Sequence, residues 1–186
     1  MRCATLLVDP GKAGDNRYSL QDYVNADSGF KLQVPENWVA ETPGGRIELF
    51  QKGEYGGKRI IISIEPLASK AADLRIFGDS ASYGKSRAAE IEADNPGTTT
   101  TLLATSEKNE ARYYYYEYVL NSFKPQHYWV VVGAGLGQNP TARKFRLRQQ
   151  ITVSCQLPEE NVETDPQDVQ LLKQIIDSFQ FIDEQS

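Results

Sequence analysis

The feature that most restricts the fold is a pair of extended segments with apolar or aromatic residues on both faces. Residues 58–66, KRIIISIEP, carry isoleucine at four of the five positions 60 to 64, and residues 113–118 read YYYYEY. Side chains alternate between the two faces of a strand, so a run without polar alternation predicts a strand covered on both sides. We therefore expect a sheet that lies between helices.

Other segments predict the remaining strands of this sheet. Residues 46–52 and 58–66 are joined by the glycine-rich sequence GEYGG, and a connection of this length predicts an antiparallel hairpin. Residues rich in β-branched and aromatic side chains suit a pleated surface. Further strands are expected at 30–34, 98–108, 111–123, 127–137 and 143–157, with a short final strand at 179–182.

Two helices are predicted. The first spans Ser80 to Ala93 and is closed by Asn95-Pro96-Gly97. The second follows Asp165, a good N-cap residue, with Pro166 at the first helical position. Its core face is expected to comprise Val169, Leu172, Ile176 and Phe179, flanked by Leu171 and Ile175. The predicted class is α+β, a mainly antiparallel sheet with helices on both faces.

Length and charge limit the domain organisation and the partners. The 186 residues fit one domain plus a tail, and we expect residues 1–27 to form a polar N-terminal arm and residues 28–186 a single domain. A net charge of −5 makes broad attraction to nucleic acid or to an anionic membrane unfavourable. The longest apolar runs, five or six residues, are too short for a membrane-spanning helix.

Residues 143–157, RKFRLRQQITVSCQL, predict a strand with one apolar and one basic face. Its apolar parity includes Cys155, which we expect to be a core thiol, although a disulfide with Cys3 stays possible. Its other face presents Lys144, Arg146 and Arg148. No short metal-type spacing is present, and the single histidine, His127, makes a structural zinc site improbable.

Two stretches resemble nucleotide-binding motifs and fail on geometry. After Gly133 and Gly135 the sixth position is Gln138, and Asn139-Pro140 leaves no room for the helix that a dinucleotide turn requires. We therefore expect these glycines to belong to a chain reversal. In GDSASYGKS five residues, instead of four, separate Gly78 from Gly84, so a nucleotide-binding enzyme is the weaker alternative.

In order and spacing, the chain resembles the PsbP family of extrinsic lumenal photosystem proteins over about residues 18–182. The segments that carry the resemblance are GFKLQVPENW, IELFQ, RIIISIEPL, LRIFGD, YYYYEYV, TVSCQLPEE and IIDSFQF. His127 lies where many members have a histidine. A longer connection, GLGQNPTARKFRLR, and Val162 in place of a frequent tryptophan indicate a divergent member.

The resemblance implies a non-enzymatic, peripheral protein of the thylakoid lumen, in a chloroplast or a cyanobacterium. Such proteins dock on intrinsic and other extrinsic subunits of photosystem II and help to retain calcium and chloride at the oxygen-evolving manganese cluster. Relatives act as assembly factors or attach to photosystem I. The manganese, calcium and chloride belong to the partner complex, so no cofactor is expected on this chain.

Two hypotheses concern particular residues. The arm 1–27 and the basic face of Lys144, Arg146 and Arg148 are expected to dock on acidic lumenal loops, with a merely solvated strand face as the alternative. His127 is either a sensor of lumenal acidification or an ordinary strand-end histidine.

Overall fold

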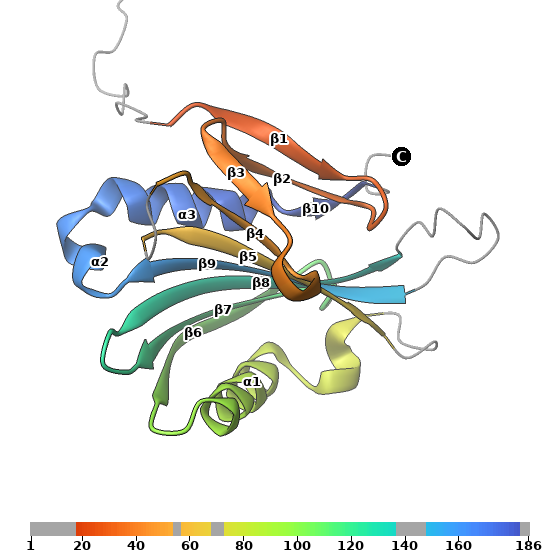
Figure 1. Ribbon diagram of the computed structural model, residues 1–186. Helices are drawn as coiled ribbons and strands as arrows, with labels where there is room; N and C mark the ends of the chain where they lie inside the picture. Colours follow the sequence, from red (N-terminus) through yellow and green to blue (C-terminus); the bar gives the residue numbers. More distant parts are fainter. Residues whose placement is uncertain (1–17, 54–56, 68–72, 137–147, 183–186) are drawn as a thin grey trace, which may run out of the picture.

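A computed structural model describes residues 18–53, 57–67, 73–136 and 148–182. It contains a seven-stranded antiparallel sheet with the order β3-β4-β5-β9-β8-β7-β6 and a three-stranded sheet with the order β1-β2-β10 (Figure 1). The strands of the large sheet are β3 (Trp38–Glu41), β4 (Ile47–Gln51), β5 (Arg59–Pro66), β6 (Thr99–Lys108), β7 (Tyr113–Asn121), β8 (Gln126–Leu136) and β9 (Arg148–Pro158). The small sheet contains β1 (Leu20–Asn25), β2 (Phe30–Pro35) and β10 (Gln180–Phe181).

The helices lie on both sides of the large sheet. Figure 1 shows α1 (Ser80–Asp94) on one face, and α3 (Pro166–Ser178) with the small sheet on the other. The helix α2 (Glu160–Thr164) precedes α3, and the short 3-10 helices η1 (Pro43–Gly45) and η2 (Leu74–Phe77) lie in connections. The predicted α+β class and the antiparallel pairing of β4 with β5 are therefore confirmed.

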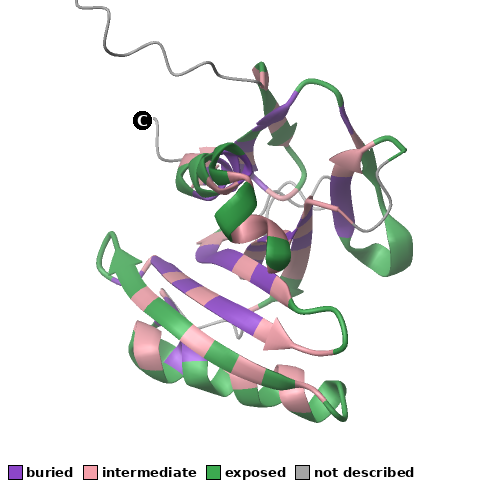
Figure 2. Cartoon of the chain, turned by 90° about the vertical axis from the view of Figure 1, so that its left-hand side faces the viewer, coloured by how far each residue is buried: buried purple, intermediate pink, exposed green. Residues whose placement is uncertain are grey.

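The core consists of two apolar layers, one on each face of the large sheet. Tyr114 and Tyr116 of β7 pack towards α1, whereas Tyr113 packs against Phe179 and Phe181 on the α3 side. Positions of β6 alternate largely between exposed and half-buried, and those of β9 between half-buried and buried; Figure 2 colours the strands by burial. The double cover predicted for the tyrosine strand is thus observed. In β5 it is less complete, because Ile60 and Ile62 are buried and Ile61 is half-buried.

Both predicted helices begin at an N-cap residue whose side chain accepts a backbone hydrogen bond. The carboxylate of Asp79 accepts a hydrogen bond from the Ser82 amide at 2.7 Å, and that of Asp165 accepts one from the Asp168 amide at 3.2 Å. The predicted core face of α3 needs one correction. Val169 is only half-buried, while Leu171 and Ile175, predicted as flanking residues, are buried. The whole face is rotated towards Asp168, whose side chain is also buried.

The predicted boundary between the N-terminal arm and the domain lies too late in the chain. Residues 20–25 form β1, which pairs antiparallel with β2 from Leu20 opposite Pro35 to Asn25 opposite Phe30. The sequence of β1 has little apolar alternation because it is an edge strand whose residues are exposed or half-buried. Backbone pairing with the following strand β2, rather than its own pattern, holds it in place. Residues 1–17 lie outside the described residues.

The glycines near residue 135 have a different role from the one expected. Gly133 and Gly135 lie inside β8 rather than in a chain reversal. A Cβ atom at Gly133 would be 2.8 Å from a ring carbon of Phe179, and one at Gly135 would be 2.2 Å from a ring carbon of Phe181. The glycines therefore leave room for two aromatic rings that pack directly on the strand. The antiparallel pairing of β8 with β9 requires the chain to reverse after these glycines, between Leu136 and Arg148, and residues 137–147 lie outside the described residues.

Cys155 is a free thiol in the core, as its strand parity predicts, and Cys3 lies outside the described residues. Complete burial raises the pKa of the Cys155 thiol far above its ordinary value. We expect a Cys3→Ser variant to react with a thiol reagent only after unfolding, because the thiolate is the nucleophile and is neither formed nor accessible in the fold. The measurement is the labelling rate at pH 8 with and without denaturant. Rapid labelling of the native variant would contradict the prediction.

Candidate functional site

The candidate site lies at the end of the large sheet where the turn between β7 and β8 meets the corner between β9 and α2. His127 is the second residue of β8 and lies opposite Val119 of β7 and Leu157 of β9 in the ladder. The backbone of Glu159 is held in the same region, because its amide donates to the carbonyl of Pro125 at 3.0 Å. Three segments that are separated in sequence thus converge on one imidazole ring.

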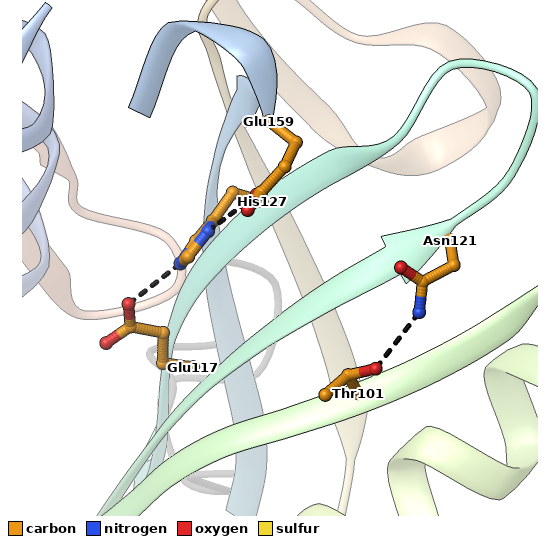
Figure 3. Close-up of polar contacts among 5 residues, drawn as sticks. All are labelled: Thr101, Glu117, Asn121, His127 and Glu159. Atoms are coloured by element: carbon orange, nitrogen blue, oxygen red, sulfur yellow. Dashed lines mark hydrogen bonds and ion pairs between the residues drawn. The ribbon is translucent and has the colours of Figure 1, made fainter. Parts of the chain in front are cut away.

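Each nitrogen of His127 contacts a different carboxylate. Its Nε2 is 2.7 Å from Oε1 of Glu117 in β7, and its Nδ1 is 2.8 Å from Oε2 of Glu159 (Figure 3). His127 is only 4% exposed, and its ring stacks on Trp129 with the centroids 4.2 Å apart. We call this arrangement of His127, Glu117 and Glu159 the His127 bridge.

The two contacts of the His127 bridge set the number of protons that the three side chains need in order to satisfy both. A short contact between a ring nitrogen and a carboxylate oxygen requires a hydrogen between the two atoms. A neutral imidazole has a single N–H, so it satisfies one of these contacts. Both contacts are satisfied when the ring is an imidazolium or when one carboxyl group is protonated. Both contacts together therefore need one proton more than a neutral imidazole beside two carboxylates carries.

Two hollows adjoin the His127 bridge. One, of about 510 Å³, is formed by the β7–β8 turn and the β9–α2 corner, and Glu159 lines it together with Phe123, whose side chain is 98% exposed. The other, of about 350 Å³, lies between α3 and strands β6 to β8, and Glu117 and Trp129 line it. The two carboxylates of the bridge thus belong to the walls of two different surface hollows.

Other contacts hold the strands and α3 around the bridge. The side-chain amide of Asn121 donates to the hydroxyl of Thr101 at 3.0 Å and joins β7 to β6 (Figure 3). The ammonium group of Lys173 in α3 lies 5.7 Å from the centre of the Trp129 ring, on which His127 stacks. The bridge therefore sits on a framework that includes both the sheet and α3.

The His127 bridge does not have the arrangement of a metal site. Its two carboxylates contact different ring nitrogens, so they do not converge on one point beside the imidazole. Within the ranges that the structure describes, no group of three or more His, Cys, Asp or Glu side chains could hold a metal ion.

The predicted docking residues are only partly described. Lys144 and Arg146 lie outside the described residues, and Arg148 is the first residue of β9, opposite Leu136 of β8. Its carbonyl accepts a hydrogen bond from the Leu67 amide at 2.9 Å. A shared basic face of the three residues stays a prediction.

Sequence reasoning singled out His127 and missed both of its partners. Glu117 is 10 residues away and Glu159 is 32 residues away, so no local spacing connects them. One signal was present. Glu117 is the only charged residue in the strand YYYYEYV, which was predicted to be covered on both sides, and a carboxylate in such a strand needs a partner.

Comparison with known proteins identifies the family. The model of the PsbP family matches residues 18–181, nearly the whole described part of the chain. The chain belongs to the PsbP family. Membership supports a photosystem-associated, non-enzymatic role on the lumenal side of the membrane. Among the described residues, no helix has the length and apolar character needed to cross a membrane.

Solved structures show that this PsbP-family chain has the expected fold. The solution structure of cyanobacterial PsbP (CyanoP) from Synechocystis sp. PCC 6803 is similar with a TM-score of 0.69 and 18% identity, covering 94% of this chain and 98% of that one. A mutant of the protein Mog1 (E65A) is similar with a TM-score of 0.51 and 12% identity, covering 89% and 97%. At these identities the likeness concerns the fold alone. No curated protein matches the sequence.

Proposed function

We propose that this PsbP-family protein is a non-enzymatic extrinsic protein of the thylakoid lumen that binds photosystem II at its oxygen-evolving complex. There it stabilises the complex and helps to retain calcium and chloride. The observation that carries the proposal is the family match over residues 18–181. The manganese, calcium and chloride belong to the partner complex, and the contribution of this chain is a binding surface.

A second candidate is a PsbP-domain assembly factor or a peripheral subunit of photosystem I. The departures from the usual family pattern favour it. Val162, which stands where many members have a tryptophan, lies in α2 and packs against the core beside α3. A smaller side chain at this position changes how α2 packs on the core, and partner choice depends on the surface that such elements present.

The docking surface in this proposal combines the N-terminal arm with the basic residues Lys144, Arg146 and Arg148. An arm that orders on binding contacts a large surface at modest affinity, and clustered cations suit acidic lumenal loops. The hydroxyl of Tyr18 donates a hydrogen bond to Asp168, near the N-terminus of α3. Residues that precede Tyr18 therefore start beside this end of the helix.

The test is binding to isolated thylakoid membranes and to purified photosystem II and photosystem I. We expect binding to photosystem II that weakens as salt is raised, because exposed charge pairs are screened by salt. Reversal of Lys144, Arg146 and Arg148 to glutamate is expected to reduce binding about tenfold or more at low salt. The matched control reverses the exposed lysines Lys52, Lys85 and Lys124.

The outcomes separate the candidates. Binding to photosystem I alone, or only to incompletely assembled photosystem II, would favour the second candidate over the first. Equal binding by the basic-face variant and the parent protein at every salt concentration would remove these three residues from the docking surface. Failure to bind either photosystem would contradict the proposed function as a whole.

A further inference from the structure

We propose that the His127 bridge is a proton-dependent contact. It holds the β9–α2 corner against β8 and breaks at Glu159 when one proton is lost. The inference concerns the chain itself and does not depend on the photosystem partner. It rests on two short contacts to one buried imidazole, at 2.7 Å and 2.8 Å, and on the weak local support of the corner that one of them holds.

Loss of the bridging proton leaves a neutral ring between two carboxylates. One ring nitrogen then presents a lone pair to a carboxylate oxygen at less than 3 Å, and two acceptors at this distance repel each other. One of the two contacts must open. The proton count therefore makes the conformation at one carboxylate depend on pH.

The contact to Glu159 is the one that opens. Glu117 lies inside β7 and is paired with Trp129 of β8 through the backbone ladder, so it is fixed by the sheet. The side chain of Glu117 is 26% exposed and that of Glu159 is 40% exposed, so Glu159 is more easily hydrated when released. Its position before α2 also allows the backbone to move.

The corner that Glu159 holds has few other anchors. In the described part of the chain, no side chain caps the N-terminus of α2, and none of its five residues is buried. Glu159 is kept near β8 by its side-chain contact to His127 and by its amide bond to the Pro125 carbonyl. Loss of the first contact leaves the corner with this one hydrogen bond to the β7–β8 turn and the partial packing of Val162 against the core.

The charged groups that surround the imidazole come from every element packed against it. Glu117 of β7 and Glu159 at the corner contact the ring, Glu160 and Glu163 follow Glu159 in α2, and Lys173 of α3 lies beyond the Trp129 ring. Four of the five are acidic. Deprotonation of the bridge therefore adds negative charge to a corner that is already acidic, which further favours release of Glu159 into solvent.

Release changes the surface hollow at this end of the molecule. Glu159 lines the hollow that Phe123 and Pro125 also line, so a freed carboxylate enters it and the Nδ1 edge of His127 becomes accessible. A partner that contacts the exposed Phe123 side chain would meet a corner held by the contact between His127 and Glu159 in acid, and a corner without this contact near neutral pH.

Glu159→Gln is the decisive variant. A glutamine amide donates a hydrogen bond to the lone pair of Nδ1, so a neutral imidazole satisfies both contacts without an additional proton. In this variant the contact between His127 and residue 159 should therefore persist both in acid and near neutral pH. Glu160→Gln is the matched control, because it removes the same charge from the adjacent exposed residue outside the bridge.

The measurement is hydrogen exchange of the amides of residues 159–165, expressed as protection factors at about pH 5 and about pH 8. We expect protection in the parent protein and in Glu160→Gln to fall about tenfold at the higher pH, the size of a lost hydrogen bond to a charged group. Glu159→Gln should show equal protection at both values. Nitrogen NMR of the His127 ring in the parent should show hydrogens on both nitrogens in acid.

Two results would overturn the inference. One is equal protection of the corner at both pH values in the parent protein. The other is the same fall in protection in Glu159→Gln as in the parent, which would mean that the bridge is not its cause. Both measurements use the isolated chain, so they are independent of whether it binds a photosystem.

Discussion

Replacing Asp168 with alanine is expected to lower the free energy of unfolding by about 3 to 5 kcal/mol, because the variant leaves a buried ammonium group without its counterion. In the native fold Oδ2 of Asp168 is 2.8 Å from Nζ of Lys58, and these side chains are only 8% and 11% exposed. Its other oxygen, Oδ1, accepts a hydrogen bond from the Tyr18 hydroxyl at 2.7 Å. The carboxylate therefore joins α3 to the residue before β5 and to the segment before β1.

Urea denaturation of the parent and variant measures this loss. The control is Asp177→Ala, which removes an exposed ion pair to Lys108 at 3.0 Å and should cost less than about 1 kcal/mol. The double variant Lys58→Met, Asp168→Leu should lose less than Asp168→Ala, since replacing both charges leaves none unpaired. A loss below about 1 kcal/mol in Asp168→Ala would show that Lys58 finds another solvated position.

Replacing Gly135 with valine is expected to destabilise the fold by about 3 kcal/mol or more, at or above the upper end of the usual cost of overpacking. A Cβ atom at this position would lie 2.2 Å from Cε1 and 2.5 Å from Cδ1 of Phe181. A valine in a strand is otherwise favoured over glycine by up to about 1 kcal/mol, so the clash decides the sign. Phe181 is buried and cannot swing into solvent.

A rescue experiment separates the clash from other effects of the substitution. Phe181→Ala alone should cost about 3 to 5 kcal/mol through the cavity it leaves. Combined with Gly135→Val it should cost clearly less than the sum of the two single changes, because the valine then occupies part of that cavity. Thermal or urea unfolding of the four proteins gives the coupling energy. Strict additivity would contradict the close approach of Gly135 and Phe181.

Much of the fold could be predicted because its signals are local. Local side-chain patterns predict three of the strands: the isoleucines of β5, the tyrosines of β7 and the apolar–polar alternation of β9. The caps at Asp79 and Asp165 are satisfied by amides three residues away. In contrast, β1 was missed because its exposed side chains carry no pattern, and the small sheet depends on residues near both ends of the described chain.

The candidate site was predictable only in part for the same reason. His127 could be noticed because it is the only histidine, but its two carboxylates come from another strand and from a distant corner. Gly133 and Gly135 were wrongly assigned to a chain reversal, because their role depends on aromatic rings more than 40 residues further along the chain.

The order of the sequence segments is typical of the PsbP family, and local patterns were enough to predict the sheet covered on both faces, the starts of α1 and α3 and the burial of Cys155. Each of these follows from interactions within one turn or one strand, or from the parity of side chains along it. The pairing of Asp168 with Lys58, the packing of Phe181 on Gly135 and the His127 bridge could not be predicted in this way. These contacts join residues far apart in the chain, and their distances are set by how the two sheets and α3 pack.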